Sequence, residues 1–155
     1  MQSLYNIDLL RRNYNENRSN RRTRGRSWTS CNKKIRKEIE DGIYIIALGT
    51  NTYATSTMIK AGADFGISGE IAISKFCSEN QLDSIIGPIG VICSGGINGE
   101  ITPMISSALF KTDCTKYIIP LQKHGMYIPG TRNLQIKDII EEIVLDIKQN
   151  IIQSY

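Results

Sequence analysis

The chain has 155 residues, of which 41% are hydrophobic and 22% are charged, and its formal net charge is +4. This length allows one domain with a substantial core and is too short for two. No stretch approaches the roughly 20 consecutive apolar residues of a membrane-spanning helix, and no charged-then-apolar leader opens the chain, so we expect a cytoplasmic protein without membrane contact.

The cysteines predict neither a metal site nor a disulfide framework. Cys31, Cys77, Cys93 and Cys114 form no CxxC pair, and His124 is the sole histidine that could join them. We interpret Cys93 and Cys114, in or beside apolar segments, as small buried side chains. A catalytic pair of Cys93 and His124 stays open as an alternative, although the spacing does not favour it and His124 lies in a polar turn.

The positive charge is concentrated in the first third of the chain. Residues 1–37 carry 11 Lys and Arg against 2 acidic residues, a net of +9, whereas residues 38–155 carry 8 against 13, a net of −5. Residues 14–32 (YNENRSNRRTRGRSWTSCN) have almost no apolar side chains and no helical or strand period. At face value they form a disordered basic arm that binds nucleic acid, with Trp28 available for stacking, or a solvated tail.

A third interpretation of this stretch comes from the genetic code. Back-translation of residues 15–34 with permitted codons gives, one frame over, M-K-I-A-V-I-D-G-Q-G-G-G-L-G-Q-V-V-I-K-K. That sequence is typical of a Rossmann βα unit, in which a glycine-rich turn brings a phosphate to a helix N-terminus. Arg11 and Arg12 can be encoded as AGGAGG, a ribosome-binding sequence, and Lys33 and Lys34 as an A-run on which reading frames slip.

We therefore predict that residues 1–32 are an aberrant, disordered basic segment, made of untranslated leader (1–14) followed by frameshifted codons. Residues 33–155 then form the domain. On this hypothesis the chain lacks its normal first strand and its glycine-rich loop. A parallel sheet without a central strand exposes apolar surface, so lower stability is expected.

The domain opens with alternating helix and strand patterns. Residues 33–40 (KKIRKEIE) predict a charged helix that stops at Asp41 and Gly42. The β-branched run 43–48 (IYIIAL) predicts a parallel strand covered on both faces. A helix over 53–61 follows, capped by Asn51 or Thr52. We expect a glycine-rich turn over 62–69 and a short helix over 70–78.

The second half continues the alternation. An apolar strand is expected over 84–92, interrupted by Gly87 and Pro88, and a loop over 95–99. Thr102 as N-cap and Pro103 as first residue open a helix to about residue 110. Short strands are expected over 116–121 and 125–128, and isoleucines at helical spacing from Ile136 predict an amphipathic last helix. The fold class is α/β, a Rossmann-like three-layer parallel sheet without its first strand.

Ligands of open parallel sheets bind outside the carboxyl ends of the strands, where the strand order reverses. That rule selects three loops, over residues 49–51, 87–90 and 95–102, whose amides and hydroxyls suit a phosphate or ribose better than acid/base catalysis. The candidate ligand-binding residues are Gly49, Thr50, Asn51, Gly87, Pro88, Gly90, Glu100 and Thr102.

Asn51 and Glu100 are the strongest of these candidates because each lies at a junction between a strand and a helix. Structural alternatives stay open: the glycines can form tight turns, Thr50 and Asn51 can cap a helix, and Glu100 and Glu70 can face helix N-termini. NAD is not favoured, because the end of the strand over 43–48 offers no acid for the ribose.

Four segments carry a resemblance to a known family: IIALGTNTYATSTMIKAGADFGISGEIAI, DSIIGPIGVI, NGEITP and KYIIPL. They resemble an uncharacterised bacterial family, a domain of unknown function, whose members look like a minimal Rossmann domain opening with a DGQGGG-type turn. The resemblance covers residues 33–147 and implies the fold and the binding loops, not a reaction. The family's glycine turn is present only in the shifted frame. Ser94, Gly95 and Gly96 stand where the family tends to carry a more polar Asn-Ser type loop.

Three functions compete. The leading hypothesis is a small protein that binds a nucleotide or another phosphate-containing ligand, impaired here by loss of the glycine-rich loop, with no cofactor or reaction assigned. The alternative is a non-enzymatic structural module, such as a homo-oligomer. A nucleic-acid binder that acts through the basic arm is the third hypothesis and the one the sequence favours least.

Overall fold

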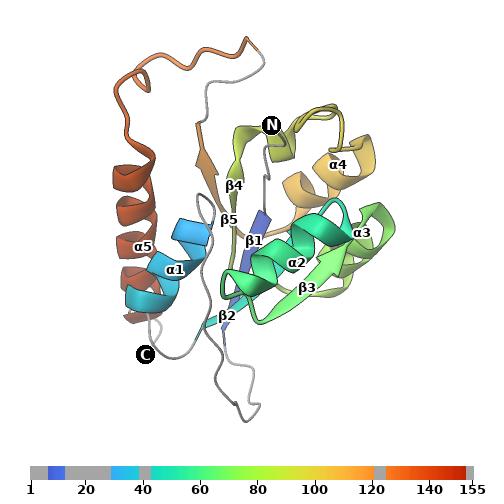
Figure 1. The fold of residues 1–155 in the computed structure, drawn as a ribbon, viewed down its shortest axis with the longest axis horizontal. Coiled ribbons are helices and arrows are strands. Elements are labelled where there is room, and N and C mark those ends of the chain that lie inside the picture. Colours follow the sequence, from blue (N-terminus) through green and yellow to red (C-terminus); the bar gives the residue numbers. More distant parts are fainter. Residues whose placement is uncertain (1–6, 13–28, 39–42, 121–124, 153–155) are drawn as a thin grey trace.

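The computed structural model describes residues 7–12, 29–38, 43–120 and 125–152 and contains one five-stranded sheet (Figure 1). The strand order is β3-β2-β1-β4-β5. The strands are β1 (Ile7–Arg12), β2 (Ile43–Gly49), β3 (Phe65–Ser68), β4 (Ser84–Pro88) and β5 (Thr115–Ile119). The pairs β2–β3 and β4–β5 are parallel, and β1 is antiparallel to both β2 and β4. Four strands therefore share one direction, and the central strand opposes them.

Helices cover both faces of the sheet. They are α1 (Thr29–Glu38), α2 (Thr52–Lys60), α3 (Glu70–Glu79), α4 (Pro103–Lys111) and α5 (Ile136–Ile152), with a 3₁₀ helix, η1 (Ile89–Ile92), after β4. Buried residues of α1, α2 and α5 share one apolar cluster with the sheet, and those of α3 and α4 share the other. Figure 1 accordingly shows α1 beside α5, away from α3 and α4. The fold is a Rossmann-like three-layer α/β fold.

The central strands are apolar without alternation because each of their faces meets a helical layer. In β2, Ile45 and Ala47 belong to the cluster under α1 and α5, whereas Ile46 and Leu48 belong to the cluster under α3 and α4. Successive side chains of a strand point to opposite faces, so both sets are buried. The continuous apolar run over 43–48 thus predicts this doubly covered strand correctly.

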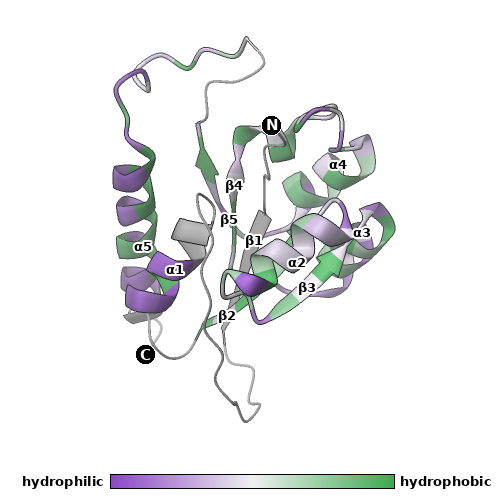
Figure 2. Cartoon of the chain, in the orientation of Figure 1, coloured by the Kyte–Doolittle hydropathy of each residue, from purple (hydrophilic) through white to green (hydrophobic). Residues whose placement is uncertain are grey.

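An apolar stripe and two ion pairs hold α5 against α1. Figure 2 shows the hydrophobic side of α5 turned inward and its hydrophilic side turned outward. Lys34 pairs with Glu141, and Lys148 pairs with Glu38 at 3.0 Å. Hydrogen bonds from these lysines lower the pKa of both glutamates. The buried residues of the stripe are Ile140, Ile143, Val144 and Ile147.

The centre of the sheet differs from the prediction. The sequence predicts an all-parallel sheet without its first strand, whereas the structure has Ile7–Arg12 in that central place, antiparallel to its neighbours. The sheet is therefore mixed. The physical reason is that β2 and β4 each present a row of backbone N–H and C=O groups toward the gap, which a strand of either direction can satisfy. Residues 13–28 of the basic segment lie outside the described residues.

Three local predictions are also wrong. The expected turn over 62–69 contains strand β3, in which Gly66 is required because a Cβ there would lie 2.4 Å from Thr55 Cγ2. The strand expected over 84–92 ends at Pro88, and η1 follows it. Residues 125–128 form no strand, and Gly125 has a φ of +73°. The remaining helices and strands agree with the prediction, although α1 begins at Thr29 rather than Lys33.

Arg36 of α1 ties together the starts of two strands. Its guanidinium donates to the Asp64 carboxylate, to the Ile43 carbonyl oxygen at 2.8 Å and to the Gly62 carbonyl oxygen at 3.2 Å. Asp64 also accepts the Ile45 N–H at 2.8 Å. The Arg36 and Asp64 side chains are 24% and 10% exposed. This largely buried network fixes α1 against β2 and the turn before β3.

Replacing Arg36 tests the network. Arg36→Met should cost about 2 kcal/mol of unfolding free energy in urea titrations, because it removes a guanidinium that binds the largely buried Asp64 carboxylate and two carbonyl oxygens. Partial solvent exposure keeps the cost below that of a fully buried pair. Lys75→Met, in an exposed pair 3.9 Å from Glu79, is the control and should cost less than about 0.5 kcal/mol. Equal losses in the two variants would contradict this role for Arg36.

Candidate functional site

The candidate site lies at the sheet edge where β2, β3, β4 and β5 end. From β2 the chain continues outward to β3, and from β3 it crosses to β4 on the other side of β1. The strand order therefore reverses at β1, and the loops after β2 and β4 flank the start of that antiparallel central strand. In open α/β sheets this is the place where ligands bind.

The structure brings two of the sequence candidates together across this point. Thr50 directly follows β2, and Glu100 lies in the loop between η1 and α4. The Thr50 hydroxyl donates a hydrogen bond to the Glu100 carboxylate. Among the residues that the structure describes, no Lys or Arg pairs with Glu100, and its side chain is exposed. The site thus presents a hydroxyl and an uncompensated carboxylate.

Asn51 and Thr102 are helix caps. Asn51 Oδ1 accepts the Ala54 N–H at 2.9 Å and caps α2, and Thr102 Oγ1 accepts the Ile105 N–H at 3.2 Å and caps α4. Both helices therefore begin at this edge with ordered N-termini. Neither helix has an acidic residue in its first turn, so no acid within either helix offsets the positive end of its dipole.

Three other candidates are buried by the protein itself. Gly87, Pro88 and Gly90 lie where η1 folds back on β4. A Cβ on Gly87 would lie 3.0 Å from Val91 Cγ2, and one on Gly90 would lie 3.4 Å from Ile97 Cγ1. The two glycines therefore allow the close packing of this turn.

A strained turn positions Glu100. Ile97, Asn98 and Gly99 have consecutive positive φ values of 52°, 55° and 86°. This left-handed conformation is costly for a β-branched residue such as Ile97, which is held in place because its side chain is only 4% exposed. Gly96 is needed beneath the turn, because its Cβ would lie 2.0 Å from the Gly90 carbonyl oxygen. Gly99 thus provides a positive φ, and Gly96 allows the close approach of the Gly90 backbone.

Sequence reasoning missed a group of hydrogen bonds beside the site, made by Asn51, Thr55 and Ser68, which we call the polar clamp. Thr55 of α2 donates from its hydroxyl to the Asn51 carbonyl oxygen at 3.0 Å, and Ser68 at the end of β3 donates to Thr55 Oγ1 at 2.6 Å. Thr55 is 4% exposed. A buried threonine one turn after an N-cap was the available signal, but the helical pattern alone did not indicate that it contacts β3.

The remaining polar candidates do not gather here. Glu70 lies in the first turn of α3, and Cys93 is half-buried after η1. Burial raises the pKa of Cys77 and Cys114, which favours the neutral thiols. His124, the suggested partner of Cys93, lies outside the described residues. In the described part of the chain, no three His, Cys, Asp or Glu side chains are grouped so as to hold a metal ion.

The fold and this edge define a Rossmann-like α/β protein with a polar site over its central strand. A family model described as "Domain of unknown function (DUF3842)" matches residues 25–152, so the chain belongs to that family. No curated protein and no solved structure matches the chain. Within the described ranges, no helix combines the length and apolarity needed to cross a membrane.

Gly49 allows a test of the packing around the clamp. A Cβ at Gly49 would lie 2.1 Å from Thr55 Oγ1 and 2.7 Å from the Thr55 backbone nitrogen. Gly49→Ala should therefore lower the unfolding free energy by about 2 kcal/mol, because the backbone cannot yield cheaply. Gly90→Ala, whose nearest contact would be a side chain at 3.4 Å, should cost less. Chemical denaturation measures the unfolding free energy of both variants. An unchanged value for Gly49→Ala would contradict the close packing of Thr55 against Gly49.

Proposed function

We propose that this protein binds a nucleotide or another phosphate-containing ligand at the edge of the sheet where β2 and β4 end and the antiparallel strand β1 begins. The observation that carries the proposal is the hydrogen bond between Thr50 and Glu100, which joins the loops on either side of the strand-order reversal. Residues at such a position can contact one ligand from both sides.

Different groups at this edge suit the two ends of a nucleotide, the ribose and the phosphate. A carboxylate without a cation repels a phosphate but accepts hydrogen bonds from sugar hydroxyls, so Glu100 and Thr50 suit a ribose. Rossmann domains usually take that acid from the end of the second strand; here Glu100 reaches Thr50, at the end of β2, from another loop. The phosphate is then left to helix N-termini and to a glycine-rich turn.

The second part of the proposal is that a frameshift has removed that turn from this chain. In the shifted reading, a strand and a glycine turn precede a helix, and α1 begins at Thr29 within the same stretch of codons. A first strand parallel to β2 would end at the candidate edge and place its glycine turn there. The antiparallel direction of β1 is consistent with a substitute strand. This chain should therefore bind its ligand weakly.

Restoring the frame tests both parts. The restored protein starts at the shifted methionine, reads MKIAVIDGQGGGLGQVVIKK and continues from Ile35. It should melt several degrees above the present chain, because a fully parallel βα unit replaces the substitute strand. Adding AMP or ADP should raise its melting temperature further, through preferential binding to the folded state. Inorganic phosphate should raise it less.

A matched control keeps the restored strand and changes the run of glycines in the turn to alanine. This control should keep most of the added stability and lose the response to nucleotides. If the restored protein melts no higher than the present chain, the frameshift proposal fails. If it melts higher but no nucleotide raises its melting temperature, the proposal of nucleotide binding fails. Codons for residues 22–28 that do not fit the shifted reading would also refute the frameshift.

Glu100 can be tested in the restored protein. Glu100→Gln should weaken AMP binding roughly tenfold, because the amide is a poorer acceptor for ribose hydroxyls than a carboxylate. Binding of 2′-deoxy-AMP should change less. Glu142→Gln, an exposed acid of α5, is the control and should leave affinity unchanged. Titration calorimetry measures the affinities, and an unaltered Glu100→Gln protein would exclude this role.

A structural module is the second candidate, favoured by apolar side chains near the edge strand β3. Phe65 is 53% exposed, Ile59 is 45% exposed and Ile71 is 77% exposed. An uncovered edge strand beside apolar side chains can pair with a second copy. Sedimentation as a stable dimer that Phe65→Glu disrupts, with no nucleotide response, would favour this candidate. The basic stretch that would bind nucleic acid falls largely at 13–28, outside the described residues.

A further inference from the structure

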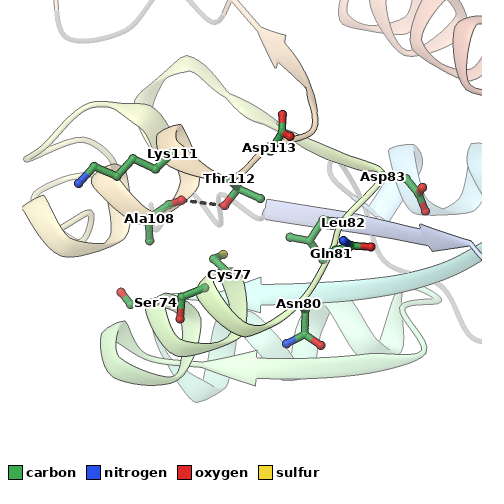
Figure 3. A pocket seen from close by; sticks show the side chains of 11 residues that line it. Ser74, Cys77, Asn80, Gln81, Leu82, Asp83, Ala108, Lys111, Thr112 and Asp113 are labelled. Atoms are coloured by element: carbon green, nitrogen blue, oxygen red, sulfur yellow. Dashed lines mark hydrogen bonds between the residues drawn. The ribbon is translucent and has the colours of Figure 1, made fainter.

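A cavity of about 740 Å³ lies at the opposite edge of the sheet from the candidate nucleotide site (Figure 3). It opens between α3 and α4, where the loop over 80–83 leads into β4 and the loop over 112–114 leads into β5. Its volume is in the range of small-molecule sites. All of its lining residues follow Ile73 in the sequence, so none of them belongs to β1.

The base of the cavity is apolar and small. Cys77 and Leu82 are only 7% and 6% exposed, and Ala108 completes this surface from α4. Burial raises the pKa of the Cys77 thiol, so this side chain stays neutral. The base therefore offers van der Waals contact to a short hydrocarbon chain and no charge.

Hydroxyl groups surround this base. Ser74 Oγ is buried in the wall without a hydrogen-bond partner among the described residues. Thr112 donates its hydroxyl to the Ala108 carbonyl oxygen at 2.7 Å, and Ser78 donates to the Lys75 carbonyl oxygen at 2.8 Å. The Thr112 and Ser78 oxygens can still accept a hydrogen bond, and rotation of the Ser74 side chain supplies another acceptor.

The rim of the cavity has groups that can hold a cation. Both α3 and α4 end at the cavity, and Lys116 already donates from Nζ to the Thr112 carbonyl oxygen after α4, so the negative dipole end left for a ligand is that of α3. The charged residues of the lining are Asp83, Asp113 and Lys111. Asp113 is exposed and forms no ion pair in the part of the chain that the structure describes. The last turn of α3 has no basic residue that would offset its dipole end.

We propose that this cavity binds a small organic cation, a diamine with a short aliphatic chain, with one ammonium at Asp113 and the chain over Cys77, Leu82 and Ala108. The hydroxyl groups and the C-terminus of α3 supply acceptors for the protons of the second ammonium. A metal ion fits less well, because no group of His, Cys, Asp or Glu with metal-binding geometry occurs among the described residues.

Thermal melts of the full chain, as it stands, test the proposal with probes of equal chain length. At about tenfold excess over its dissociation constant, putrescine should raise the melting temperature by about 3 °C, whereas butanediol and succinate at the same ionic strength should not. An equal or larger shift with succinate would overturn the proposal. So would the absence of a putrescine shift at millimolar concentrations.

Two variants locate the binding. Asp113→Asn should weaken putrescine binding about fivefold, as expected for loss of one partly exposed charge, whereas Asp138→Asn on α5 should not. Ser78→Phe should fill the cavity and abolish the shift, and Ser56→Phe, at an exposed position of α2, is its control. Unchanged putrescine affinity in both Asp113→Asn and Ser78→Phe would show that the amine binds elsewhere, and the proposal would fall.

Discussion

The backbone N–H and C=O groups of β2 and β4 that face the centre of the sheet need partners, and this is the constraint on which the rest of the structure depends. Each of these strands is buried on both faces, and each has one edge turned toward the centre of the sheet. Buried backbone groups that lack partners are costly, so the gap must hold a strand. Here Ile7–Arg12 fills it with reversed direction. The two helical layers and both sheet edges are arranged around that central place.

At one edge of the sheet, close backbone packing and polar contacts are combined. Gly49 lets Thr55 approach the end of β2, and the strained turn at Ile97 and Asn98 brings Glu100 to Thr50. A buried hydrophobic side chain thus holds an unfavourable backbone conformation that places an exposed carboxylate over the central strand. At the opposite edge, two helices end around a cavity with apolar and hydroxyl groups. The two edges therefore differ in chemistry, with a hydroxyl and a carboxylate at one and an apolar base with hydroxyl groups at the other.

The sequence alone determined most of the local structure. Apolar runs of strand length gave β2 and β4, and cap residues such as Asn51 and Thr102 marked the helix starts, because these signals depend only on neighbours along the chain. The strand β3 was not predicted because glycine normally weakens strands. The need for glycine at position 66 follows only from the close approach of Thr55 and Ile59 of α2.

Tertiary structure alone decided the direction of the central strand and which residues come together at the two candidate sites. Thr50 and Glu100 were both candidates in the sequence, but their contact depends on strand order and on the left-handed turn, neither of which a local pattern encodes. The same holds for the cavity, whose lining comes from two helices and the loops that follow them. Sequence determined which segments form helices and strands, and long-range packing determined which of their polar ends meet, because contacts between distant segments follow from how the layers assemble.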